Sequence, residues 1–308
     1  MYRRIDPIFE MVTPLLFAHR GGAKEVPEST VRGFHHAKRV GTDVFEIDIQ
    51  LTRDEQMVVW HGPSLDNVRL AGEENRKTTR SRTDIGDYDW SELRDKAWVA
   101  DPGTGKDLLN DVPKESDRHL LLFEEFLRLF PTATLNVEMK ECFRPHHLKE
   151  FISVLNRNNP ERVKVVASNR NESLLREFRT QTGGRFATNL PFRSLLGCRL
   201  IAGIGLLRFL NLNQRGLELP HQRILSPKSM IEQVRAAGGG TYVFLTRIPF
   251  FKSLDAEPNH PDRQSLFAIL DRGVDGIMTD RPAHVRELMD RWIALHPFST
   301  GAEPSRFS

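Results

Sequence analysis

One strand-like segment carries two carboxylates at a spacing that suits a metal site. Glu46 and Asp48 are two residues apart in VFEIDIQL (44–51), so both side chains lie on one face of a strand. Ile47 and Ile49 alternate with them and lie on the opposite face, which is typical of packing against helices. Charges on the buried face of a sheet must be paired or bind a metal, and this pattern therefore predicts one of these two arrangements.

A second segment repeats the pattern with both signs of charge. TLNVEMK (134–140) carries Glu138 and Lys140 on one face of a strand. With the two carboxylates of the first segment, Glu138 makes a set of three oxygen donors, which suits one hard divalent cation, Mg²⁺ or Ca²⁺. The alternative is a structural ion-pair cluster, in which Arg20 and Lys140 neutralise the same carboxylates.

Two histidines and one arginine complete the set of reactive side chains. Of the 11 histidines, only His19 and His61 end apolar, strand-like runs, although each alone also fits a structural role. Arg20 is followed by Gly21 and Gly22, which combine a guanidinium with a backbone that can approach an anion closely. A cation, an arginine, a lysine and two histidines suit phosphoryl chemistry, with the histidines as base and acid.

These residues need a scaffold that brings strand ends together. Strand-like runs alternate with segments of helical period, which favours parallel strands covered by helices. Eight such runs in a chain of 308 residues predict a (β/α)8 TIM barrel, whose active site lies at the carboxyl ends of the strands. The predicted strands are 15–19, 44–51, 134–140, 163–168, 184–190, 223–226, 241–246 and 276–280.

We interpret the chain as a single barrel domain over residues 1–308. Residues 62–118 are polar and lack a sustained apolar pattern, and we expect them to form an insertion after the second strand. The short run MVVWH (57–61) is expected to pair back on that strand. The tail 297–308 is expected to be loose.

The composition excludes several classes of protein. Two cysteines exclude a disulfide-dense scaffold, and a net charge of +3, from 44 basic and 41 acidic residues, gives no reason to expect a nucleic-acid partner. No run reaches the roughly 18 apolar residues that span a bilayer. The N-terminus lacks the layout of a signal peptide, so we expect a cytoplasmic protein, with peripheral membrane contact as an open alternative.

The chain resembles the glycerophosphodiester phosphodiesterase family. The resemblance rests on motifs that occur in the family's order over nearly the whole chain, and together they are highly specific. The motifs are AHRGG (18–22), PEST (27–30), EIDIQLT (46–52), VVWHGPSL (58–65), LNVEMK (135–140) and GVDGIMTDRP (273–282).

The resemblance implies a TIM barrel with a small insertion after the second strand, and it implies roles for seven residues. The implied roles are metal binding by Glu46, Asp48 and Glu138, acid–base catalysis by His19 and His61, and phosphate binding by Arg20 and Lys140. Three positions depart from the family pattern. Gly62 stands where the family usually has Asp, Ser29 where it has Asn, and Leu245 near its usual Trp. The last departure bears on the lining of the alcohol or glycerol pocket.

From this set we expect a metal-dependent phosphodiesterase that cleaves a glycerophosphodiester to sn-glycerol 3-phosphate and an alcohol. His19 is expected to act as base and His61 to protonate the leaving alcohol, and the attacking group is water or the substrate's own 2-hydroxyl. One alternative is a lysophospholipase D that acts on lysophospholipids with the same residues. Another is an inactive barrel that binds phospholipid headgroups, although such a binder has no need of both histidines. The oligomeric state is left open.

One apolar stretch bears on the choice of substrate. In residues 195–212, twelve of eighteen positions are apolar and three of the others are glycine. One interpretation is a buried fifth barrel helix that is kinked near Gly203 and Gly205. The other is a hydrophobic lip near the barrel mouth that contacts a membrane or an acyl chain. Anionic headgroups would then meet Arg193, Arg199, Arg208 and Arg215. The second interpretation favours lysolipid substrates.

Overall fold

The computed structural model covers most of the chain. It describes residues 13–66, 68–70, 84–100, 115–158, 164–191, 194–223, 225–245 and 260–296. The predicted loose tail (297–308) lies outside this part, as do residues 71–83 and 101–114 of the predicted insertion. Within these ranges, no helix is both long enough and apolar enough to cross a membrane.

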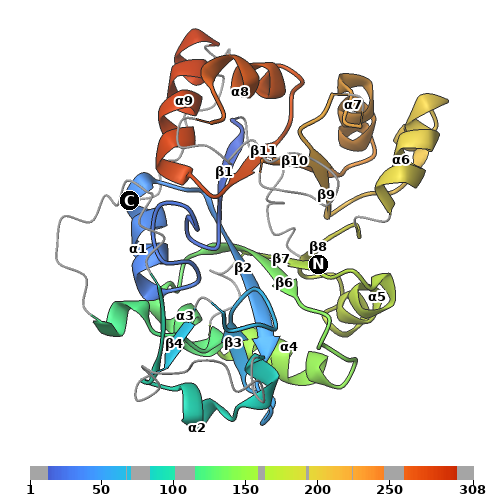
Figure 1. The fold of residues 1–308 in the computed structure, drawn as a ribbon. Helices are drawn as coiled ribbons and strands as arrows, with labels where there is room; N and C mark the ends of the chain where they lie inside the picture. The colour runs from blue at the N-terminus through green and yellow to red at the C-terminus, as the bar shows by residue number, and fades with distance from the viewer. Residues whose placement is uncertain are drawn as a thin grey trace.

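Parallel strands close into a barrel, and this confirms the predicted TIM-barrel fold (Figure 1). In the described part of the chain the barrel strands are β1 (Leu15–His19), β2 (Val44–Leu51), β6 (Thr134–Met139), β7 (Lys164–Ser168), β8 (Ala187–Asn189), β9 (Arg215–Pro220), β10 (Gly240–Phe244) and β11 (Gly276–Thr279). They pair in the order β1-β11-β10-β9-β8-β7-β6-β2, and a further pairing of β1 with β2 closes the ring. Because the strands are parallel, their carboxyl ends meet at one rim.

Helices surround the barrel (Figure 1). Those around the barrel are α1 (Val31–Val40), α3 (Phe123–Leu129), α4 (His147–Arg157), α5 (Glu172–Gln181), α6 (Ser194–Gly203), α7 (Lys228–Ala236), α8 (Arg263–Leu270) and α9 (Pro282–Leu295). The first shows how local sequence sets the bounds. Thr30 Oγ1 accepts a hydrogen bond from Gly33 N at 3.1 Å and begins α1, and Gly41, at φ 77°, ends it in a left-handed conformation.

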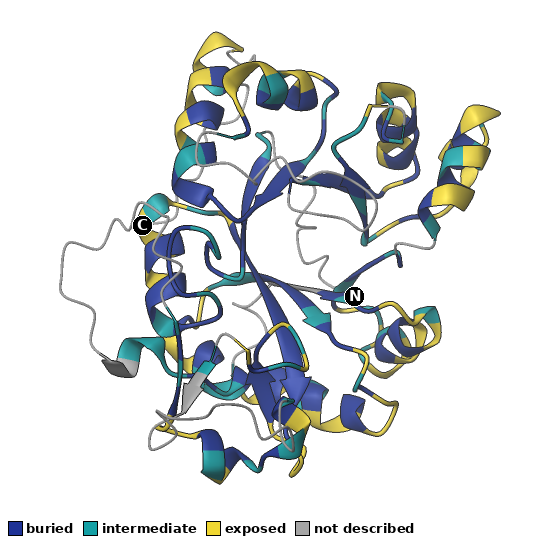
Figure 2. Ribbon diagram, viewed as in Figure 1, coloured by how far each residue is buried: buried dark blue, intermediate teal, exposed yellow. Residues whose placement is uncertain are grey.

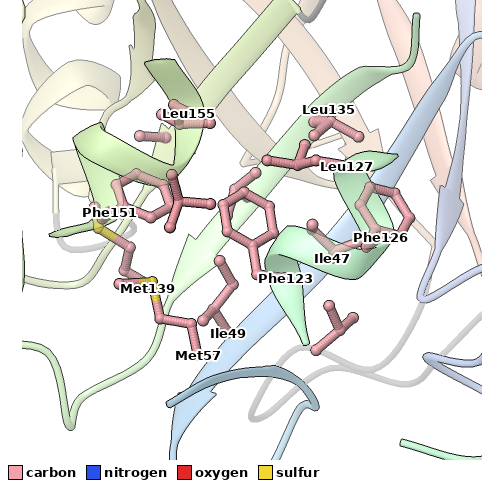
Figure 3. Close-up of a cluster of buried hydrophobic side chains, with 14 of the residues drawn as sticks. Ile47, Ile49, Met57, Phe123, Phe126, Leu127, Leu135, Met139, Phe151 and Leu155 are labelled. Atoms are coloured by element: carbon pink, nitrogen blue, oxygen red, sulfur yellow. The ribbon is translucent and has the colours of Figure 1, made fainter. Parts of the chain in front are cut away.

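The hydrophobic core lies between the barrel and its helices (Figure 3). Ile47 and Ile49 of β2 are fully buried there, beside Phe123 and Phe126 of α3 and Phe151 of α4. Since side chains alternate along a strand, the residues between the two isoleucines and beside them point into the barrel. The apolar packing outside β2 thus fixes the inward direction of its carboxylates.

The insertion after β2 forms a small layer of its own. Strand β3 (Met57–Val59) pairs antiparallel with β2, which confirms the predicted pairing of MVVWH. A second pair joins β4 (Val68–Leu70) and β5 (Ala97–Val99). The remaining elements of this layer are the short helices η1 (Ile85–Asp87), α2 (Trp90–Leu93) and η2 (Glu115–Arg118).

The predicted strand at 223–226 is wrong. The strand in this part of the barrel is β9, which ends at Pro220, and the chain then turns. Ser226 N donates to Gln222 O at 3.2 Å, and Ser226 Oγ donates to Pro220 O at 2.8 Å. The alternation of β9 is weak in the sequence because Glu218 and Pro220, residues that strands disfavour, flank Leu219.

Candidate active site

The charged rim is formed by neighbouring strands in register. His19, the last residue of β1, pairs with Glu46 of β2, and Asp48 of β2 pairs with Glu138 of β6. His19, Glu46 and Asp48 are 4%, 4% and 1% exposed. Residues from three strands therefore meet in two adjacent layers of the barrel interior, at the carboxyl end where TIM-barrel active sites lie.

His19, Glu46 and Asp48 form a compact group of donors. Their ligand atoms all lie within 4.8 Å of one another, and His19 Nε2 is 3.7 Å from Glu46 Oε2. The backbone N–H of Arg20 also donates to Glu46 Oε2 at 3.2 Å. Burial and the neighbouring Asp48 raise the pKa of Glu46 well above its ordinary value, so this carboxylate lacks sufficient positive charge around it. A divalent cation would supply that charge, and the two carboxylates suit such an ion, while His19 lies beside them.

Asp48 lies between two cations. Lys140 Nζ is 2.6 Å from Asp48 Oδ1, and Arg20 Nε is 3.1 Å from Oδ2. Burial opposes ionisation, but Lys140 and Arg20 outweigh it and hold the pKa of Asp48 below its usual range. Burial opposes the charge of Arg20 and Lys140, but Asp48, together with Glu28 and Glu46 for Arg20 and Glu138 for Lys140, outweighs it and raises the pKa of both. Arg20 and Lys140 are therefore charged, as phosphate binding requires.

Glu138 is held by Lys140 and stands outside the compact donor group. Lys140 Nζ donates to Glu138 Oε2 at 2.8 Å, and this same ammonium contacts Asp48. Burial raises the pKa of Glu138, and Lys140 opposes the shift. Lys140 thus links Glu138 to the donor group, while metal binding by Glu138 stays a prediction.

His19 is oriented by Asp280, which the sequence analysis missed. His19 Nδ1 lies 2.5 Å from Asp280 Oδ1, and the imidazole edge rests on Phe244 at a centroid distance of 4.9 Å. Asp280 directly follows β11, so it lies at the same rim. A carboxylate on Nδ1 fixes the imidazole ring and leaves Nε2 toward the site. Asp280 could have been identified from the sequence because it ends the predicted strand 276–280, where active-site residues of such barrels lie.

His61 follows β3 and stands at the exposed edge of the same cluster. Gln50 Nε2 donates to the His61 carbonyl at 3.1 Å and holds the backbone there. Burial lowers the pKa of His61 to about 3, and the positive charges of Arg20 and Lys140 act in the same direction, against Asp48. His61 is therefore neutral at pH 7. Its response to all three charged groups shows that it lies within electrostatic reach of them.

Further polar residues lie inside the barrel and were also missed. Tyr242 Oη donates to Glu218 Oε1 at 3.1 Å, and Asn136 Nδ2 donates to Tyr242 Oη at 3.4 Å. Asn189 donates to Tyr242 and to Asn136. Burial raises the pKa of Glu218 to about 7, and the negative charge of Glu138 adds to the shift. Glu218 was missed because the strand that carries it was misplaced.

The departure at Leu245 does not alter the site lining. Leu245 is fully buried in the core outside the barrel, together with Val243. Because β10 alternates, Tyr242 and Phe244 point into the barrel. Phe244 is therefore the aromatic residue that lies beside His19, and Leu245 itself packs in the core outside the barrel.

A second group of possible metal ligands lies on the surface and does not fit a cation. Glu55, His146 and His147 lie within 4.8 Å of one another. His147 Nδ1 accepts a hydrogen bond from Arg144 N at 2.9 Å, which places the proton of the neutral imidazole on Nε2. That nitrogen lies 3.4 Å from Glu55 Oε1 and is occupied as a donor. We place no metal there.

Comparisons with known proteins show which family the chain matches. The model of the glycerophosphoryl diester phosphodiesterase family matches residues 19–284. The chain is 26% identical over 303 residues to lysophospholipase D GDPD1 of Homo sapiens, covering 92% of this chain and 86% of that protein.

Two solved structures share the fold. A glycerophosphoryl diester phosphodiesterase from Parabacteroides distasonis matches with a TM-score of 0.64 and 19% identity, over 97% of this chain and 91% of that one. An Oleispira antarctica phosphodiesterase, solved with the product sn-glycerol-3-phosphate, matches with a TM-score of 0.63 and 18% identity, over 90% and 97%. With the family model matched over most of its length, the chain belongs to the glycerophosphoryl diester phosphodiesterase family and is an enzyme of that family.

Proposed function

We propose that this enzyme hydrolyses glycerophosphodiesters to sn-glycerol 3-phosphate and an alcohol, with one divalent cation, Mg²⁺ or Ca²⁺. The observation that carries the proposal is the buried group of His19, Glu46 and Asp48, flanked by two cations at the carboxyl rim of the barrel. Glu46, Asp48 and Glu138 are the carboxylates that would hold the metal. The chemistry that such an ion supplies when bound is neutralisation of a phosphate oxygen.

The chain's own residues supply charge and proton transfer. Arg20 and Lys140 remain charged in the barrel interior and bind the phosphate. His19 acts as the base, because Asp280 at 2.5 Å orients its ring and stabilises the imidazolium that forms. We assign to His61 the transfer of a proton to the leaving alcohol. A bound phosphodiester brings negative charge to His61 and raises its pKa from the low value of the free enzyme.

The assay that tests the proposal follows release of sn-glycerol 3-phosphate from glycerophosphocholine, glycerophosphoethanolamine and glycerophosphoinositol. We expect turnover of at least one of these with added Mg²⁺ or Ca²⁺ and none after chelation. Phosphorus NMR of the reaction distinguishes attack by water from attack by the 2-hydroxyl, which passes through a cyclic phosphate. Binding of all three compounds without turnover would instead indicate an inactive headgroup binder.

A lysophospholipase D activity is the second candidate, and one observation favours it. The segment from α6 to just beyond the short helix η3 (Leu207–Phe209) exposes six large apolar side chains outside the barrel. A water-soluble glycerophosphodiester has no use for such a surface, whereas a one-tailed lipid is presented by membranes and micelles. Adding lysophosphatidylcholine to the same assay decides between the candidates by the ratio of the two turnover rates.

A further inference from the structure

One face of the molecule exposes an unusual density of apolar side chains. We name it the α6–η3 surface. It consists of Leu196, Leu200, Ile204, Leu206, Phe209 and Leu210, which are 44–77% exposed. In the described part of the chain, only two other large apolar side chains are exposed, Leu129 and Leu295, and they stand singly. Scattered exposed leucines are ordinary in soluble proteins, but a contiguous set marks a binding surface.

The fold does not need these exposed side chains, because the opposite face of the same segment already packs on the barrel. Leu195, Cys198 and Ala202 of α6 are buried, and Leu207 of η3 is fully buried in the same core. Gln233 of α7 donates to Ala202 O at 3.0 Å and fixes α6 on its neighbour. The interpretation of this stretch as a buried fifth helix therefore holds only for the face that packs on the barrel. Figure 2 shows the outward faces of α6 exposed.

The exposed side chains form a regular stripe. Leu196, Leu200 and Ile204 are spaced by four residues, so they lie above one another on α6 and just beyond its end. The helix is thus apolar on two faces, and such a helix is normally covered on both. Within this structure the outer face has no apolar cover, so the cover must come from outside the described part of the chain.

The charges around the surface indicate which partner it suits. Residues 190–217 contain four arginines and no Asp or Glu. Arg215 pairs with Glu172 of α5 at 3.1 Å, while Arg208 is exposed within the surface itself. The single exposed leucines differ, because Leu129 lies on α3 near Glu124 and Glu125. Apolar side chains in a segment that carries arginines and no acidic residue match an anionic lipid surface.

We propose that the α6–η3 surface lies on the headgroup–acyl boundary of an anionic lipid surface, and that it brings the enzyme to lysophospholipid substrates held there. The substrate part rests on the proposed function. Because α6 follows the carboxyl end of β8, its first turn lies at the active-site rim. Leu212 N donates to Ala237 O, close to the amino end of β10, so the stretch ends at the opposite side of the barrel.

The surface therefore runs along the flank of the barrel from the rim downward. The expectation that all of residues 195–212 lie at the mouth is wrong, because the barrel helix carries the chain back to the amino ends of the strands. With this flank on the lipid, the rim that holds His19 opens beside the headgroups. A lysophospholipid then needs to move only its headgroup and phosphate into the barrel, while its chain stays in the lipid.

The test is co-sedimentation of the full chain with vesicles of phosphatidylcholine alone and of phosphatidylcholine with phosphatidylglycerol. The variant is Leu200→Ser with Ile204→Ser, which removes two exposed side chains and leaves the buried Leu207 in place. The matched control is Leu129→Ser with Leu295→Ser, two exposed leucines elsewhere on the molecule. We expect wild type and control to bind anionic vesicles, and the variant to bind at least about tenfold more weakly. Salt should weaken the binding of wild type.

Hydrolysis of glycerophosphocholine, measured on the same three proteins, separates the two proposals. Equal turnover in all three shows that the variant is folded, and turnover without vesicle binding by wild type overturns the surface proposal alone. Vesicle binding that the variant loses, without turnover of any diester, overturns the proposed function and leaves the surface standing. Light scattering provides the remaining outcome. A wild-type dimer that the variant converts to a monomer, with no vesicle binding, makes a second copy the partner and contradicts the lipid proposal.

Discussion

The barrel rim buries charged side chains, whereas the α6–η3 surface exposes apolar ones. Both arrangements are the reverse of what is usual for these residues. At the rim, Asp48 is 1% exposed, and on the surface Phe209 is 77% exposed. Asp48 is stabilised from within, because Lys140 and Arg20 lie 2.6 and 3.1 Å from its oxygens. Phe209 has no such compensation from the residues that the structure describes. The difference indicates that the rim is assembled by the fold for chemistry, whereas the surface is completed only by a partner.

The largest expected effect is at the rim. We predict that Glu46→Gln lowers turnover by about 10³-fold or more, because it removes a carboxylate that we propose as a metal ligand, and metal stabilisation is worth several kcal/mol. The fold should persist, since the pKa of Glu46 is already raised by burial and a neutral amide relieves that cost. Thermal melting checks the fold. Glu55→Gln, in the surface cluster that does not fit a metal, is the matched control and should keep wild-type turnover.

A somewhat smaller effect is expected at the histidines. His19→Ala and His61→Ala should each lower turnover by roughly 10²–10⁴-fold, the usual contribution of general acid–base catalysis. The double variant should be little worse than either single variant, because the two residues act on one reaction. Steady-state rates of the three variants check this, with His146→Ala as the surface control. Wild-type turnover by His61→Ala would contradict its assignment.

Glu218 should make a smaller contribution, visible in stability against pH. Burial raises its folded-state pKa from 4.5 to about 7, so between these values the folded protein binds a proton that the unfolded chain has lost. The free energy of unfolding should therefore fall as pH rises through this window, on the order of 1–3 kcal/mol. Glu218→Gln should remove that part of the slope. Urea unfolding in the presence of a chelator measures the difference, and Glu177→Gln, on the exposed face of α5, should show none.

The smallest effect on turnover of a soluble substrate is expected at the α6–η3 surface. Leu200→Ser with Ile204→Ser should change turnover of soluble glycerophosphocholine by less than about twofold, since surface substitutions away from the site are near neutral. The same variant should lose about tenfold on lysophosphatidylcholine held in anionic vesicles. The ratio of the two rates is the readout. An equal loss on both substrates would mean that the flank supports the rim and is no separate surface.

The alternation of apolar and charged residues predicted those strands whose two faces differ in polarity. In β2 and β6, isoleucine, valine and methionine alternate with charged residues, and the paired charges at positions 46, 48, 138 and 140 came directly from that alternation. The strand β9 was missed, because in RGLELP the alternation is short and is broken by glycine and proline. Glu218, which lies on β9, was therefore not predicted as a residue of the barrel interior.

Contacts between distant residues could not be predicted from the pattern. His19 and Asp280 are 261 residues apart, and only closure of the barrel between β1 and β11 brings them together. The same limit applies to the stretch 195–212. Its composition shows that the stretch is apolar, but it does not show which of its side chains pack into the core. The structure separates Leu207, fully buried, from Leu206, which is half exposed.

The central claim is that the buried carboxylates at the rim hold a metal on which hydrolysis depends. The most direct measurement is release of sn-glycerol 3-phosphate by exhaustively chelated wild type, before and after Mg²⁺ or Ca²⁺ is restored, together with calorimetric titration of the same ion into wild type and Glu46→Gln. We predict no turnover without the ion, full recovery with it, and binding by wild type that the variant loses. Full activity of the chelated enzyme, or equal binding by the variant, would contradict the account.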